Sequence, residues 1–139
     1  MNEKITVLGK EPVNPIGTCF DSAAAIFIRL SPSEFRDAKL CHGIGISNYP
    51  GQPDEPIAHA WIEATDKSYG RVALDPIWMV MQPASVYRKN LQVSLVIEYS
   101  YRFFLKKWRE KKYPGPYDKR ILAMTIEGKK SKENNYGSR

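Results

Sequence analysis

Two short runs rich in β-branched and apolar residues, separated by three polar residues, place the strongest constraint on how this chain folds. The runs are Ile57–Thr65 and Tyr69–Asp75, and the Asp-Lys-Ser sequence between them is typical of a turn. We therefore expect an antiparallel β-hairpin here. Because a hairpin alone is marginally stable, the rest of the chain has to extend or cover it.

The length of the turn sets which residues of the hairpin face each other. If Thr65 pairs with Tyr69, then His59 lies directly opposite Asp75. Residues opposed in this way have Cβ atoms about 4.5–5.5 Å apart, which lets a carboxylate accept a hydrogen bond from an imidazole. A change of one residue in the turn would move the pair off register.

Segments before the hairpin predict helices and a further strand. Thr18–Leu30 is apolar nearly all round, which indicates a buried helix, and Thr18 can cap it. Ser31–Ala38 starts with Ser, Pro and Glu in positions that favour a second, short helix. Leu40–Ser47 alternates and predicts a strand. Lys4–Leu8 is either a short strand or an extended arm.

After the hairpin, Gln92–Tyr101 is rich in β-forming residues, Phe103–Lys112 predicts a helix, and Arg120–Glu127 suits either state. The order of helix and alternating strands predicts an α+β fold in which the helix at Thr18–Leu30 packs on an antiparallel sheet. The chain has 139 residues, of which 42% are hydrophobic, and this fits a single domain, placed at residues 1–127. The polar residues 128–139 predict a disordered tail.

Composition excludes several classes of protein. Two cysteines cannot form a disulfide framework, and together with two histidines they make a poor structural zinc site, so we expect no metal and no cofactor. No apolar run approaches the length of a membrane span, and the first residues lack the apolar stretch of a secretory signal. We therefore expect a cytoplasmic protein with no membrane partner.

Cys19, His59 and Asp75 together suit thiol chemistry. Cys19 falls in the first turn of the predicted buried helix, where the helix dipole and free N–H groups favour a thiolate and an oxyanion. Asp75 can fix the tautomer of His59 and leave its other nitrogen for the cysteine. Each residue also has a purely structural alternative. Cys19 suits a small core residue, His59 a hydrogen-bonded histidine on a strand, and Asp75 a turn former before Pro76.

The same residues resemble the transglutaminase-like superfamily. His59-Ala60-Trp61-Ile62-Glu63 followed by Val72-Ala73-Leu74-Asp75-Pro76 is similar to the family's histidine and aspartate strands, and Gly17–Asp21 is similar to its nucleophile segment. The resemblance covers roughly Pro15 to Trp78. It implies a papain-like core, a Cys-His-Asp triad, and peptidase, amidase, deamidase, transglutaminase or acyltransferase activity on a protein or peptide.

Other residues near these motifs have candidate roles. Gly17, Trp61 and Trp78 are candidate substrate-binding residues, and Trp61 is equally suited to the core. Cys41 and His42 are adjacent, so on a strand they point to opposite faces and cannot pair, which favours a core role for Cys41. Glu63 is expected to meet Arg71 across the hairpin.

The charge is unevenly distributed. Residues 1–87 hold 7 Lys and Arg against 10 Asp and Glu, whereas residues 88–139 hold 14 against 5. The cations include Lys106, Lys107, Lys111 and Lys112, interleaved with aromatic residues. This pattern suits an ordinary solvated helix, and it also suits a surface that binds an acidic protein or nucleic acid. A non-catalytic binding module is therefore the alternative to a cysteine hydrolase or acyltransferase.

Overall fold

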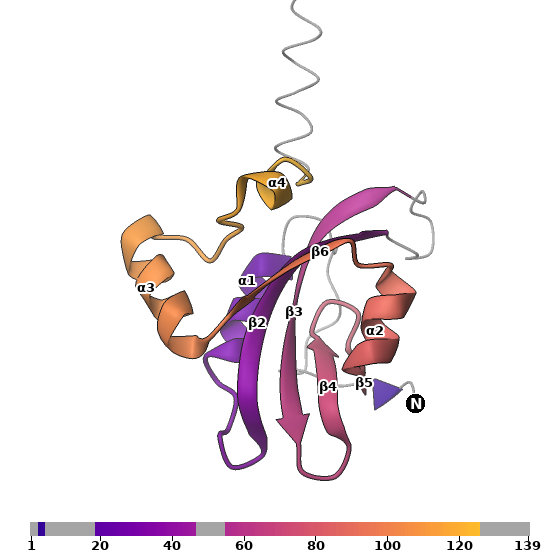
Figure 1. Cartoon of the computed structure of the whole chain (residues 1–139). Helices are drawn as coiled ribbons and strands as arrows, with labels where there is room; N and C mark the ends of the chain where they lie inside the picture. Colours follow the sequence, from indigo (N-terminus) through magenta and orange to yellow (C-terminus); the bar gives the residue numbers. More distant parts are fainter. Residues whose placement is uncertain (1–2, 5–18, 47–54, 126–139) are drawn as a thin grey trace, which may run out of the picture.

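The computed structural model describes residues 3–4, 19–46 and 55–125, and this part of the chain combines helices with an antiparallel sheet (Figure 1). The helices are α1 (Cys19–Phe27), α2 (Ala84–Leu91), α3 (Tyr101–Lys111) and α4 (Lys119–Leu122). The strands are β1 (Glu3–Lys4), β2 (Phe35–Ile46), β3 (Pro56–Asp66), β4 (Gly70–Asp75), β5 (Val80–Pro83) and β6 (Leu95–Tyr99). The α+β prediction is confirmed.

The strands form one sheet in the order β1-β5-β4-β3-β2-β6, and every neighbouring pair is antiparallel. Strands β4 and β3 occupy the two central positions. The long strand β2 pairs with β3 on the other side, with Cys41 opposite Trp61 and Gly43 opposite His59. The predicted hairpin therefore lies in the middle of the sheet.

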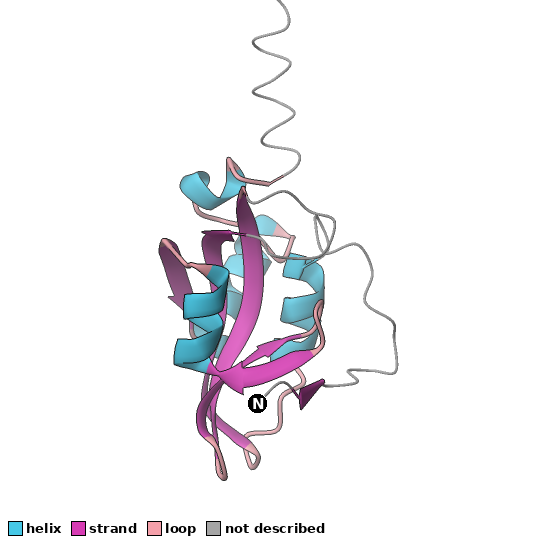
Figure 2. Ribbon diagram, turned by 90° about the vertical axis from the view of Figure 1, so that its right-hand side faces the viewer, coloured by secondary structure: helices cyan, strands magenta, loops and turns pink. Residues whose placement is uncertain are grey.

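Helices cover both faces of this sheet (Figure 2). Alternation along β3 explains why, since its even-numbered and odd-numbered side chains point to opposite faces and both sets include buried apolar residues. One core joins α1 to the even-numbered side chains: Phe20, Ala23, Ala24 and Phe27 with Leu40, Ala60, Ile62, Val72 and Leu74. A smaller core joins α2 to the odd-numbered ones: Tyr87 and Leu91 with Cys41, Trp61 and Ala73.

The register of the hairpin differs from the predicted one by two residues. Thr65 pairs with Arg71 and Asp66 with Gly70, so the loop consists of residues 67–69. The observed loop has three residues, like the predicted one, but lies one residue further along the chain. The Asp66 carboxylate accepts hydrogen bonds from the backbone N–H groups of Ser68 and Tyr69, which stabilises the turn at this position. A shift of two residues keeps every side chain on its predicted face, whereas a shift of one would have reversed them.

The predicted short helix at Ser31–Ala38 is wrong. The Ser31 carbonyl accepts from the N–H groups of Glu34 and Phe35, which makes a single turn, and β2 begins at Phe35. Phe35 pairs with Asp66 at the far end of β3. Pairing with a long neighbouring strand outweighs the weak helix signal of a cap and a proline.

Other boundaries lie close to the predictions. Strand β6 falls within the predicted strand at 92–101, and α3 begins two residues earlier than predicted. Helix α4 occupies the start of 120–127, for which the sequence suited either helix or strand. Ser100 caps α3, because its hydroxyl accepts from the Phe103 N–H at 3.2 Å. The sequence analysis did not predict β5 or α2. Thr18, residues 5–8 and the predicted tail at 128–139 lie outside the described residues.

His42 is enclosed in an aromatic box on the α1 face. Its side chain is fully buried, and neither ring nitrogen has a hydrogen-bond partner among the described residues. Phe20 and Tyr99 lie edge-on to the ring at 4.9 Å, and Tyr117 lies at 5.8 Å. A Cβ built on Gly115 would be 2.4 Å from the imidazole, so only glycine fits there. Burial lowers the pKa of His42 to about 3.

This burial predicts an acid-sensitive fold. The unfolded chain takes up a proton at His42 near pH 6.5, whereas the folded chain takes it up only near pH 3. Folding stability attributable to His42 is therefore lost as the pH falls below about 6.5, by about 1.4 kcal/mol per pH unit and about 2 kcal/mol at pH 5. Urea unfolding of the wild type and of His42→Leu at pH 7 and pH 5 tests this. The variant should lose much less stability on acidification, and equal losses would contradict the prediction.

Candidate functional site

Cys19 is the first residue of α1 and lies against the sheet. Its side chain is 1% exposed, and the helix that carries it is anchored by Phe20, Ala23 and Phe27 in the larger core. The N-terminus of a helix presents unpaired N–H groups and a partial positive charge. The sulfur is therefore held at a rigid position where negative charge is favoured.

The structure brings His59 and Asp75 together beside this cysteine. His59 Nε2 lies 2.7 Å from Asp75 Oδ2, and the Cys19 side chain lies close enough to the same imidazole to raise its pKa. Since Asp75 occupies Nε2, Nδ1 is the ring nitrogen left for the thiol. All three side chains are almost fully buried.

His59 and Asp75 meet in a different way from the predicted one, in which they lie directly opposite each other on the hairpin. In the observed register the paired part of β3 and β4 starts at Ile62 and Leu74, so His59 lies outside it. Asp75 is the last residue of β4 and follows Leu74, the last one that pairs with β3. The two residues are therefore diagonal neighbours on one face, a separation that a histidine and an aspartate side chain can bridge.

Asp75 also organises the turn that follows it. Its Oδ1 accepts hydrogen bonds from the backbone N–H groups of Ile77 at 3.0 Å and Trp78 at 3.2 Å. Asp75 therefore has both of the roles considered for it: it forms the turn before Ile77, and it is the hydrogen-bond partner of His59. The turn fixes the side-chain rotamer and directs Oδ2 toward the imidazole.

Tyr87 is a further member of the cluster that sequence reasoning missed. Its hydroxyl donates to Asp75 Oδ2 at 2.5 Å, and it is fully enclosed between α2 and the sheet. The residue was overlooked because α2 was not predicted. A signal was present, since Ala84, Tyr87 and Leu91 follow Pro83 at helical spacing.

The electrostatics of the cluster favour a charged imidazole. Burial by itself lowers the pKa of His59, but the Asp75 carboxylate, through its charge and its hydrogen bond, outweighs this and raises the pKa to about 10. Burial raises the pKa of Asp75, and the positive charge of His59 and the hydrogen bonds to Asp75 more than reverse that shift. Burial raises the pKa of Tyr87 well above 10, so it remains a donor.

The tryptophans next to His59 have different surroundings. The Trp78 ring stacks on the imidazole, with ring centroids 4.4 Å apart and planes at 23°. Trp61 is fully buried, 6.3 Å from the same ring, and its Nε1 donates to Glu63 at 2.8 Å. Trp61 therefore belongs to the core, and Trp78 is the aromatic residue that covers His59. Gly17 lies outside the described residues.

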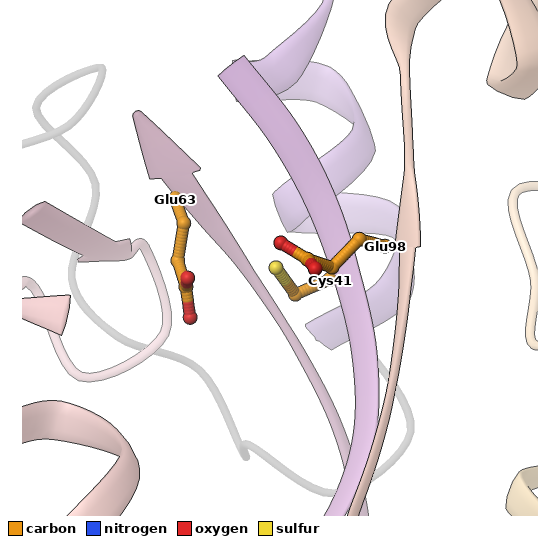
Figure 3. Close-up of side chains that lie close together, drawn as sticks. All are labelled: Cys41, Glu63 and Glu98. Atoms are coloured by element: carbon orange, nitrogen blue, oxygen red, sulfur yellow. The ribbon is translucent and has the colours of Figure 1, made fainter. Parts of the chain in front are cut away.

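Cys41, Glu63 and Glu98 form a second cluster, on the α2 face, in which the three side chains approach one another (Figure 3). Their sulfur and carboxylate atoms lie within 4.8 Å of one another. Arg88 already supplies positive charge here, because its guanidinium donates to both oxygens of Glu63 at 2.7 and 2.9 Å and lies 3.6 Å from Glu98. A metal ion would have to displace this bidentate pair.

The same ion pair corrects the predicted contact between Glu63 and Arg71. In the observed register Glu63 pairs with Ala73, and its carboxylate turns to Arg88. Arg71 instead donates to the Asp37 carbonyl at 2.6 Å and to Thr65. The difference follows from the two-residue shift in the register of the hairpin.

Comparisons of the chain with models of protein families, with curated proteins and with solved structures find no match. Among the described residues, no helix has the length and apolar character needed to cross a membrane.

The two histidines of the chain are expected to differ in charge at neutral pH, with His59 positive and His42 neutral. His59 should remain protonated at pH 8, whereas His42 should remain neutral at pH 5, and both states are visible in imidazole nitrogen NMR shifts. In Asp75→Asn the carboxylate that raises the pKa of His59 is gone, and burial should outweigh the smaller effect of Cys19, so His59 should become neutral at pH 7 while His42 is unchanged. An ordinary titration of His59 near pH 6.5 in the wild type would contradict this.

Tyr87→Phe should lower the free energy of unfolding by about 1.5–3 kcal/mol, because it removes a buried hydrogen bond to a charged group. Tyr99→Phe is the matched control. Tyr99 is also buried, but its hydroxyl has no hydrogen bond to Asp75, so the loss should be under about 1 kcal/mol. Chemical denaturation measures both, and equal losses would show that the Tyr87 hydroxyl contributes nothing specific.

Proposed function

We propose that this protein is a cysteine-dependent hydrolase or acyltransferase that acts on an amide or thioester through an acyl-enzyme on Cys19. The observation that carries the proposal is the chain of contacts from Cys19 to His59 and from His59 to Asp75, at 2.7 Å. A buried nucleophile, a base and an orienting carboxylate in hydrogen-bond contact are the requirements for this chemistry.

In the proposed reaction the Cys19 sulfur, as a thiolate paired with the His59 imidazolium, attacks the carbonyl carbon of the substrate. The N–H groups at the start of α1 stabilise the oxyanion that forms. When the carbon–nitrogen or carbon–sulfur bond breaks, His59 gives its proton to the leaving group and a thioester on Cys19 remains. Water or an amine then attacks the thioester, His59 accepts a proton from it, and the thiolate is restored.

Asp75 and Tyr87 act on this reaction through His59. Asp75 keeps the imidazole oriented and stabilises its positive charge, and Tyr87 shares Oδ2 of the carboxylate with it. Trp78 shields the imidazole with its ring face, which limits the access of water to the ion pair.

The proposal includes the resemblance to the transglutaminase-like superfamily and its papain-like core. It is supported by the chain order Cys19, His59, Asp75, by the position of the cysteine at a helix start, and by the packing of that helix on an antiparallel sheet. The substrate in this proposal is a protein or peptide, and the acyl acceptor is either water or an amine.

The two cysteines allow an internally controlled test. Cys19 and Cys41 are 1% and 0% exposed, so burial alone predicts equal protection from alkylation. Activation by His59 predicts that a peptidyl vinyl sulfone labels Cys19 at least about tenfold faster than Cys41. Burial, followed by the negative charge of Glu63, raises the pKa of Cys41. Mass spectrometry of the labelled peptides gives both rates.

Variants complete this test. His59→Ala should remove the difference between the two cysteines, and Asp75→Asn should reduce it less, since the base is retained. Cys19→Ala should leave the fold intact and abolish both rapid labelling and turnover, whereas Cys41→Ala should leave rapid labelling unchanged. Equal labelling rates for Cys19 and Cys41 in the wild type would refute the proposal, because labelling would then report unfolding alone.

A further inference from the structure

Helix α3 makes little contact with the body of the protein. It lies at the margin of the molecule, beside β2 and β6 and on the side away from α2 and β5 (Figure 1). Phe104 is its only buried residue and packs against Phe27 at the end of α1. Most of the helix surface therefore faces solvent.

This exposed surface carries unbalanced positive charge. Residues 101–112 contain six Lys and Arg and one Glu, and none of these cations forms an ion pair with the part of the chain that the structure describes. Arg102, Lys106 and Arg109 are exposed and follow one another at intervals of four and three residues. This spacing places them on one stripe of the helix.

Aromatic rings flank the stripe and are only half covered. Tyr101 is 50% and Trp108 40% exposed, although each also contacts the core, through Phe27 and Phe104 respectively. Phe103 is less available, because Tyr99 stacks against it and Lys107 lies over its ring at 5.7 Å.

These contacts distinguish two kinds of partner. Bases of a single-stranded nucleic acid need open ring faces on which to stack, and the Phe103 ring, although 45% exposed, is already contacted by Tyr99 and Lys107. Half-exposed Tyr and Trp rings beside Arg are instead the composition of protein interfaces, where anchored aromatic residues bury apolar area.

We propose that the α3 surface, formed by Arg102, Lys106, Arg109, Tyr101 and Trp108, docks an acidic, amphipathic segment of another protein. Carboxylates of the partner meet the cationic stripe, and its apolar side chains cover the two rings. The surface is separate from the candidate active site, since α3 contacts α1 at Phe27, eight residues and about 12 Å of helix from Cys19. The proposal therefore does not rest on the proposed function.

The test measures binding of a fluorescein-labelled acidic peptide, in which Glu and Asp alternate with Leu and Phe, by fluorescence anisotropy at low and physiological salt. The peptide should bind, and binding should weaken with salt. The combined variant Arg102→Glu, Lys106→Glu and Arg109→Glu should reduce affinity by about tenfold or more.

The matched control reverses three exposed cations that are not on α3: Arg29→Glu, Lys67→Glu and Lys89→Glu. It changes the net charge equally and should alter affinity by less than about threefold, since none of the three belongs to the α3 surface. Circular dichroism checks that both variants fold. An equal loss in the control would overturn the proposal, as would tighter binding of a deoxythymidine oligonucleotide of matched charge.

A second peptide, with Ser in place of Leu and Phe, tests the apolar part of the interface. It should bind the wild type about tenfold more weakly, because no apolar side chain of the peptide then packs against Tyr101 and Trp108. Equal affinity of the two peptides would show that charge alone attracts the ligand and would overturn the docking proposal.

Discussion

The ionised carboxylate of Asp75, buried at the end of β4, is the group on which the surrounding structure depends. A buried charge is tolerated only when its hydrogen-bonding capacity is satisfied and an opposite charge lies close by. Asp75 meets both conditions within the described residues, because it accepts from two backbone N–H groups, from Tyr87 and from His59. The turn after β4, the packing of α2 and the charge of the imidazole are all coupled through this one side chain.

The two buried histidines show how the same side chain acquires opposite properties from its surroundings. His59 has a carboxylate at 2.7 Å, which more than offsets the cost of burying its positive charge. His42 has only aromatic rings and the glycine backbone around it, so nothing compensates that cost and the neutral form persists. One histidine is thereby suited to proton transfer, and the other makes the packing of the C-terminal segment sensitive to acid.

Charge is also separated in space. The ionisable groups around Cys19, His59 and Asp75 are enclosed by the sheet, α1 and α2, whereas the cations of α3 lie on a helix that contacts the body mainly through Phe104. Arg88 illustrates the difference. It belongs to the basic region 88–139, but its guanidinium binds the buried carboxylate of Glu63. The remaining cations on α3 have no such acidic partner in the described structure, and this leaves their field directed outward.

The sequence by itself determined the features that depend on neighbouring residues: the hairpin at Ile57–Asp75, the buried helix at Cys19, the faces on which His59 and Asp75 lie, and the basic third. Alternation, helical periodicity and turn composition are local, so they can be recognised without a structure. The tertiary structure decided which partners these elements met. It made Phe35 part of a strand and shifted the pairing register of the hairpin by two residues, so that Glu63 binds Arg88 instead of Arg71. It also brought Tyr87, on an unpredicted helix, to Asp75. Such contacts are selected by burial and hydrogen-bond satisfaction between distant segments, and the intrinsic preference of a short segment carries no information about them.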